Sequence, residues 1–222
     1  MGAVAAEPRI RGLRHPWTIE VLTEDELERV HRATLTVLAR VGLEVRSEDI
    51  RRELARAGAR VDDAAMRVRF PPEMVEEHLA LIPPTFVMAA RDPALDLPID
   101  GSAGWLSGDG TSAFVVDLET GRRRPSTMRD LIETTRVADA VPELAYLWPT
   151  VAPQDVPPHT QAAHYLHVML AHSTKHAQHN EVYSRRDAQV VLEMARAVAG
   201  GDRELRARPI VSTYQCCISP LV

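Results

Sequence analysis

Residues 144–181 read LAYLWPTVAPQDVPPHTQAAHYLHVMLAHSTKHAQHNE, and this stretch decides the fold. The run Leu144–Trp148 is typical of a buried strand, the segment from Thr160 to Ala171 is typical of a helix, and Lys175–Asn180 is typical of a second strand. A strand, a crossover helix and another strand in this order form a βαβ unit, whose two strands are parallel. The stretch therefore predicts an α/β protein.

The same order of elements continues on both sides of this stretch. One helix is predicted over Met128–Ala140, another over Arg185–Ala199, and a third strand over Ile210–Gln215. Each unit takes about 30 residues, and eight of them would occupy about 250 residues, the usual extent of a (β/α)₈ TIM barrel. We therefore expect a TIM barrel that is truncated here to an N-terminal α+β region plus its first three βα units. On this interpretation the chain is the front part of a longer protein.

The first 125 residues have a different pattern of predicted elements, with helices followed by short strands. Thr23 and Glu26 form a capping box at the start of a helical pattern, and Ser47 and Pro71-Pro72 begin two more helices. Short strand-like runs then predict an antiparallel meander; they are Thr85–Ala90, Leu95–Ile99, Gly104–Ser107 and Ala113–Leu118. The sequence thus predicts an α+β region over residues 1–125 and a barrel domain over residues 126–222. Residues 1–16 are expected to be a flexible lead-in.

Composition and charge limit the possible partners. The chain has 222 residues, 45% of them hydrophobic, and a net charge of -5, so neither nucleic acid nor an anionic membrane is an expected partner. It contains no apolar run of the roughly 18 residues that a membrane-spanning helix needs. The two cysteines, Cys216 and Cys217, are adjacent and predict no framework disulfide, which favours a cytoplasmic location. An incomplete barrel would leave an unpaired sheet edge, so we expect a homo-oligomer.

Polar and aromatic residues gather where the three predicted strands end. In TIM barrels the chemistry lies at the carboxyl ends of the strands. The candidate site residues at these ends are Trp148, Asp155, His179, Glu181, Tyr214 and Gln215.

Several stretches together resemble the trimethylamine methyltransferase family. They are LTEDELERVHRATLTVLARVGLEV (22–45), RFPPEMVEEHL (69–79), IPPTFVMAARDP (82–93), VVDLETGRRRPST (115–127), RVADAVPEL (136–144), PTVAPQDVP (149–157) and STYQCCISPL (212–221). The resemblance implies a TIM-barrel enzyme that moves a methyl group from a methylated amine, such as trimethylamine or glycine betaine, to the cobalt of a corrinoid (cobalamin) on a partner protein. The chain itself contains no Asp-x-His-x-x-Gly arrangement that would ligate the cobalt, so we expect it to bind no cofactor of its own.

This reaction suggests roles for the candidates. Trp148 and Tyr214 are expected to contribute to an aromatic wall, since aromatic faces attract methylated ammonium groups, and Glu181 or Asp155 to balance the ammonium charge. Structural alternatives remain open for each of them. Trp148 could fill the barrel bottom or a helix interface, and Asp155 could hydrogen-bond its own turn or cap the next helix. Glu181 could face solvent, and Tyr214, which alternates with Thr213 and Gln215, could face away from the cavity.

Two other functional classes remain open. The first is a metal enzyme, because six histidines fall within 21 residues; they are His159, His164, His167, His172, His176 and His179. However, His176 and His179 are three apart on a strand and so point to opposite faces, and no Glu accompanies the helical pair His164 and His167. We therefore expect no metal site. The second class is a truncated product without catalytic activity.

Overall fold

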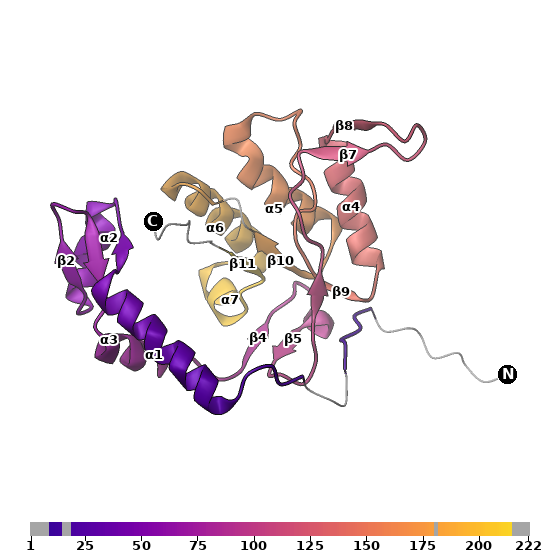
Figure 1. The fold of residues 1–222 in the computed structure, drawn as a ribbon. Helices are drawn as coiled ribbons and strands as arrows, with labels where there is room; N and C mark the ends of the chain where they lie inside the picture. The colour runs from indigo at the N-terminus through magenta and orange to yellow at the C-terminus, as the bar shows by residue number, and fades with distance from the viewer. Residues whose placement is uncertain (1–8, 15–18, 180–181, 215–222) are drawn as a thin grey trace. The chain divides into compact units, whose positions relative to one another are not determined.

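The computed structural model describes residues 9–14, 19–179 and 182–214. The described residues form two compact units, one of residues 9–14, 85–179 and 182–214 and a smaller one of residues 19–84 (Figure 1). This division differs from the predicted boundary after residue 125, because strands before that residue pack with the βα units that follow it.

The smaller unit packs helices with a short antiparallel sheet. Its helices are α1 (Glu24–Arg40), α2 (Glu48–Arg56) and α3 (Pro72–Leu79), and its strands are β1 (Leu43–Glu44), β2 (Arg60–Asp62) and β3 (Arg67–Arg69), in the order β1-β3-β2. The predicted capping box at the start of α1 is confirmed, with Glu26 N donating to Thr23 Oγ1 and Thr23 N donating to Glu26 Oε2. Gly42 has a positive φ of 67° where the chain leaves α1 for β1.

A parallel sheet forms the centre of the larger unit. Its described strands are β6 (Leu106–Ser107), β9 (Leu144–Leu147), β10 (His176–His179) and β11 (Val211–Thr213), in the order β11-β10-β9-β6, and every pair is parallel. The predicted parallel α/β arrangement of the last three strands is therefore confirmed. The strand β6 differs from prediction, because it joins this sheet beside β9 instead of forming part of a meander.

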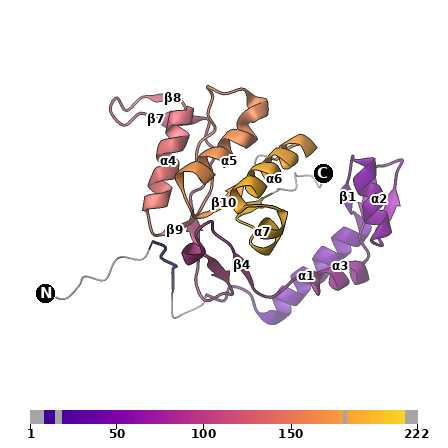
Figure 2. The same ribbon diagram turned by 180° about the vertical axis from the view of Figure 1, so that it is seen from behind.

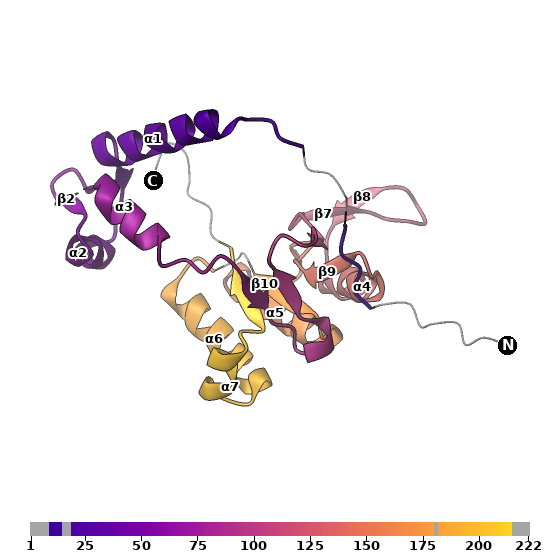
Figure 3. The same ribbon diagram turned by 90° about the horizontal axis from the view of Figure 1, so that it is seen from below.

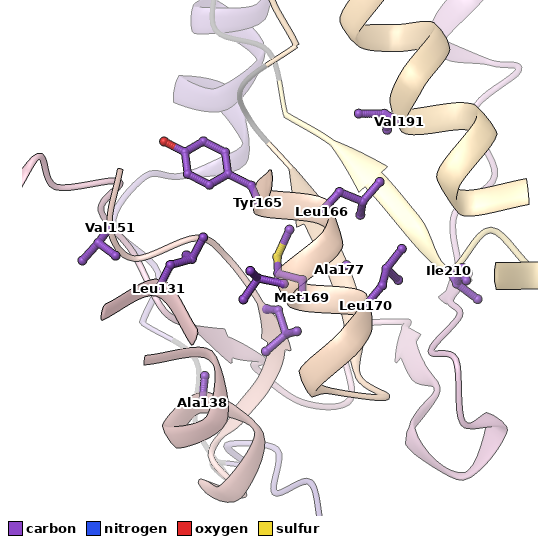
Figure 4. Packing of buried hydrophobic residues seen from close by; sticks show 12 residues of the cluster. Leu131, Ala138, Val151, Tyr165, Leu166, Met169, Leu170, Ala177, Val191 and Ile210 are labelled. Atoms are coloured by element: carbon purple, nitrogen blue, oxygen red, sulfur yellow. The ribbon is translucent and has the colours of Figure 1, made fainter. Parts of the chain in front are cut away.

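Helices cover one face of this sheet. They are α4 (Met128–Ala140), α5 (Gln161–His172) and α6 (Arg185–Ala199), with the short α7 (Asp202–Ala207) before β11 and the 3-10 turn η2 (Pro158–Thr160) before α5. Figure 2 shows α4, α5 and α6 side by side on this face. The core of the unit lies between these helices and the sheet, where α5 contributes Tyr165, Leu166 and Met169, each at most 1% exposed (Figure 4). Burial of such side chains is the main force that holds the helices on the sheet.

Two antiparallel hairpins replace the predicted meander. One pairs β4 (Phe86–Met88) with β5 (Leu97–Ile99) around the 3-10 turn η1 (Pro93–Leu95), and the other pairs β7 (Phe114–Val116) with β8 (Arg123–Pro125). Arg208, just before β11, donates to both carboxylate oxygens of Asp96 at 2.8 and 2.7 Å and to the carbonyl of Ala90. These contacts bind the first hairpin to the chain just before β11. Figure 3 shows the ribbon from below, with α6 and α7 next to each other.

Residues 9–14 are not the flexible lead-in that their composition predicts. Leu13 pairs with Gly104 through two backbone hydrogen bonds of 2.8 Å, and Arg11 N donates to Pro142 O. Arg9 also forms an ion pair with Asp92. Backbone pairing over long sequence separations, which composition does not reveal, fixes this segment. In the described part of the chain, no helix is both long and apolar enough to cross a membrane.

Candidate functional site

Alternation along the strands gives the parallel sheet two faces. Leu147 and Ala177, which pair in register, belong to the core under the helices. The neighbouring residues point the other way. We call this opposite face the site face; it carries Tyr146, Trp148, His176, Gln178, Ser212 and Tyr214.

Two predicted residues meet on the site face. The rings of Trp148 and Tyr214 have centroids 5.6 Å apart and are tilted by 56°. Tyr214 is 49% exposed, whereas the indole Nε1 of Trp148 is buried and has no hydrogen-bond partner among the residues that the structure describes. The two residues follow β9 and β11 directly, so this aromatic pair spans the carboxyl end of the central strand β10. The structure thus brings together the two residues that we expected in an aromatic wall.

His179 does not lie on the site face. It is fully buried on the helix side, where its Nε2 donates to the carbonyl of Ala162 at 2.8 Å. The ring of Tyr165 meets it edge-on at 5.9 Å. Sequence reasoning placed His179 at the correct strand end, but its odd spacing from Gln178 turns its side chain towards α5.

Asp155 contacts a helix end. Its Oδ1 accepts a hydrogen bond from the backbone N of Met128 at 2.9 Å, and its side chain is exposed. Met128 is the first residue of α4, and the amide of Asp130, two residues further on, donates to Thr127 Oγ1. Asp155 therefore caps a helix, but the capped helix is the preceding α4 and not, as the sequence suggested, the next helix.

Two candidates, Glu181 and Gln215, lie outside the described residues. Their predicted roles in charge balance and substrate binding stay predictions.

Lys175 accounts for part of the unusual polarity of the second strand. It lies just before β10 and is 1% exposed, and its Nζ donates to the carbonyls of Ala138, Val141 and Leu144 at 2.7, 2.9 and 2.7 Å. Burial lowers the pKa of this amine from its ordinary value. Lys175 therefore satisfies two carbonyl groups at the C-terminal end of α4 and one at the start of β9. These contacts lie at the amino end of the sheet, away from the aromatic pair.

The residues that sequence reasoning missed are the polar residues of the site face. His176 is 2% exposed; its Nδ1 lies 2.7 Å from the carbonyl oxygen of Ala89 and its Nε2 lies 2.8 Å from Ser212 Oγ. Gln178 Nε2 lies 3.4 Å from the same hydroxyl. Burial lowers the pKa of His176, while the bond to Ala89 and the charge of Asp96 act in the opposite direction. The signal that could have found Gln178 and Ser212 is their even spacing from His176 and Tyr214.

The histidine-rich stretch does not assemble a metal centre in the part of the chain that the structure describes. No group of three His, Cys, Asp or Glu side chains there could hold an ion. His176 and His179 face opposite sides of β10, as their spacing predicts, and each hydrogen-bonds a backbone carbonyl.

Comparisons with known proteins agree on one family. Residues 3–222 match the family described as trimethylamine methyltransferase (MTTB). The chain is 34% identical over 199 residues to the trimethylamine methyltransferase MttB of Desulfitobacterium hafniense (strain DSM 10664 / DCB-2), an alignment that covers 90% of the chain and 40% of the relative. It is 27% identical to the glycine betaine methyltransferase of Desulfitobacterium hafniense (strain Y51), with 90% and 41% covered. The trimethylamine methyltransferase MttB of Methanosarcina barkeri is 27% identical, with 91% and 42% covered. The chain thus spans about 40% of the length of these relatives.

Proposed function

The chain belongs to the trimethylamine methyltransferase family, and on that premise we propose that it forms part of an enzyme that demethylates a small methylated amine. In this proposal the acceptor of the methyl group is the Co(I) centre of a corrinoid that a partner protein carries. The amine and the corrinoid are both substrates. Membership of the family supports methyl transfer as the reaction, and the aromatic pair supports a methylated amine as the methyl donor.

The proposed fold of the whole enzyme is a (β/α)₈ barrel with the site face turned inward. The support is the parallel sheet, its repeated strand and helix order, and the confinement of α4, α5 and α6 to one of its faces. In such a barrel the carboxyl ends of the strands surround the site. Trp148 and Tyr214 are then at the mouth of the cavity.

The reaction requires orientation more than proton transfer. The electron pair of Co(I) forms a Co–CH₃ bond, the N–CH₃ bond breaks, and its electron pair stays on nitrogen, which leaves as a neutral amine. Cobalt is formally oxidised from Co(I) to Co(III), and the positive charge on the ammonium disappears. A site for this step must align the C–N bond with the cobalt and exclude water.

The contact of Trp148 with Tyr214 carries the proposal. Two aromatic faces at 5.6 Å and 56° form a tilted wall against which N-methyl groups can pack. A cation over an aromatic face gains about 0.5–2 kcal/mol, with tryptophan the most favourable ring. Substitution of Trp148 should therefore weaken amine binding by roughly 2- to 30-fold.

Methyl transfer can be tested with the protein at its natural length. We would incubate it with trimethylamine or glycine betaine and a reduced corrinoid protein, and follow methyl-Co(III) formation by absorbance. Trp148→Leu should raise the amine concentration needed for half-maximal rate. Trp105→Leu is the matched control, because Trp105 directly precedes β6 at the amino end of the sheet and its half-buried indole donates to the carbonyl of Pro98. The proposal fails if no methylated amine yields methyl-Co(III), or if both variants behave alike.

A further inference from the structure

Three hydrogen bonds connect the backbone at the amino end of the sheet with Gln178. The carbonyl oxygen of Ala89 can only accept, so the Nδ1 atom of His176, 2.7 Å away, must carry a hydrogen. His176 is buried, and burial favours its neutral form. In a neutral imidazole that donates from Nδ1, the Nε2 atom is an acceptor. The tautomer of His176 is thus fixed by its surroundings.

The direction of the remaining bonds follows from this tautomer. Ser212 Oγ, 2.8 Å from the His176 Nε2 acceptor, must donate its only hydrogen to it. The serine oxygen can then only accept from Gln178, so the amide NH₂ of Gln178 faces Ser212 at 3.4 Å. This last bond is long, and its main effect is to orient the Gln178 amide with its NH₂ group towards Ser212. The Oε1 atom of Gln178 is consequently the end that points away from Ser212.

Gln178 lies directly beside the aromatic pair. It is on the central strand β10, paired with Ser212 of β11, and Tyr214 is two residues further along. On the other side, the pairing of Ala177 with Leu147 places Trp148 next to Gln178. Among the described residues, none donates a hydrogen bond to Gln178 Oε1, and the side chain is partly exposed. An oriented acceptor therefore adjoins two aromatic rings.

We propose that Gln178 Oε1 accepts the N–H of a protonated tertiary methylammonium ion and so makes the site prefer tertiary over quaternary amines. This inference rests on the proposed function. A protonated trimethylamine carries three methyl groups for the aromatic faces and one N–H for the amide oxygen. A quaternary ammonium has no N–H, and its fourth substituent leaves the acceptor unpaired. Sites built to hydrogen-bond a substrate reject analogues that lack the hydrogen-bonding group.

Ser212 and His176 are positioning residues in this scheme. Ser212 hydrogen-bonds Gln178, and His176 hydrogen-bonds Ser212. Together they keep the Gln178 amide from rotating by 180°. Without the serine hydroxyl, either end of the amide can face the substrate, and the NH₂ end repels an ammonium N–H. A hydrogen bond to a charged group contributes about 1.5–3 kcal/mol, so the preference for a tertiary amine should be on the order of 10- to 150-fold.

The preference can be measured by calorimetric titration of the protein at its natural length. The probes are trimethylammonium and tetramethylammonium chloride at pH 7.5, and the readout is the ratio of their dissociation constants. The wild type should prefer trimethylammonium by at least tenfold. Gln178→Met, which keeps length and volume but removes the acceptor, should reduce the ratio to about 1–2 and leave tetramethylammonium binding unchanged. Gln178→Glu keeps an acceptor and should retain the preference.

The positioning role has its own readout. Ser212→Ala should lower the ratio several-fold in the wild-type background and have no effect on it in Gln178→Met, because the hydroxyl acts only through the amide. Melting curves of every variant check folding.

The possible results separate this inference from the proposed function. An unchanged ratio in Gln178→Met overturns the role of Gln178, and the proposed function still stands if the protein methylates a corrinoid. A wild-type ratio near 1 likewise overturns it. If the wild type binds neither cation and transfers no methyl group, both proposals fail.

Discussion

Substitution of Asp155 separates two roles that this carboxylate could have. In the structure its Oδ1 accepts from Met128 N at 2.9 Å, at the first turn of α4. The resemblance to amine methyltransferases instead suggested that it balances an ammonium charge. Asn and Ala replacements affect these roles differently, because Asn keeps an acceptor oxygen of the same reach and loses only the charge.

The expected magnitudes follow from helix capping. Loss of a capping side chain to Ala costs about 1 kcal/mol, within a range of roughly 0.5–2. A negative charge near a helix N-terminus contributes about 0.3–1 kcal/mol at an exposed position such as this one. Asp155→Ala should therefore lower the free energy of unfolding by about 1 kcal/mol. Asp155→Asn loses only the charge and should lower it by about 0.3–1 kcal/mol.

Urea unfolding and amine titration together decide between the roles. If Asp155 only caps α4, both variants bind trimethylammonium as tightly as the wild type. If it balances the ammonium, Asp155→Asn binds the amine at least fivefold more weakly than the wild type. The second outcome would refute the reasoning from the capping geometry. Arg129→Ala, which removes an exposed ion pair with Glu133 on the same helix, is the control and should change stability by less than about 0.5 kcal/mol.

Two further predictions concern the amino end of the sheet. Lys175→Met should lower the free energy of unfolding by about 3–5 kcal/mol in urea melts, because three carbonyl groups lose a buried, charged donor; a loss below about 1 kcal/mol would contradict this role. Burial lowers the pKa of folded His176, so below about pH 6.5 the unfolded chain takes up a proton that the folded chain resists. Its contribution to stability is therefore complete above that pH and decreases as the pH falls. The melting temperature should therefore fall as the pH is lowered from 8 to 5. Asp96 and Arg208 keep their charges over this range, and His176→Asn should make the melting temperature less dependent on pH.

The sequence predicted the βα units because their signals are local. Alternating apolar strands, Pro and Gly at helix ends and the capping box at Thr23 and Glu26 depend on neighbours within a few residues. The strand β6 was assigned to the wrong sheet because it has only two residues, and its partner β9 lies almost 40 positions further along. Pairing of such a short strand depends on tertiary packing, which periodicity cannot report.

The site was predicted in part, for a related reason. The strand ends were located correctly, and the aromatic pair was found because large rings at strand ends are easily recognised. The candidates were chosen by strand end and polarity, and not by the face of the sheet on which each side chain lies. Because side chains alternate along β10, Gln178 lies on the same face of the sheet as Trp148 and Tyr214, whereas His179 lies on the face that packs against the helices. Polarity alone suggested His179, yet its polar atom serves the carbonyl of Ala162 on α5.

The distribution of charge on the two faces has a consequence for catalysis. The charged groups Asp155 and Lys175 satisfy the two ends of α4, while the described residues of the site face are aromatic or neutral and polar. The ammonium charge disappears as the methyl group leaves, so a carboxylate beside nitrogen would stabilise the bound substrate more than the transition state and would slow the step. Aromatic faces and an amide oxygen bind the cation more weakly than a carboxylate does. They therefore lose less interaction energy as the positive charge disappears. If the proposed function holds, the neutral described part of the site face favours methyl transfer over tight binding of the amine.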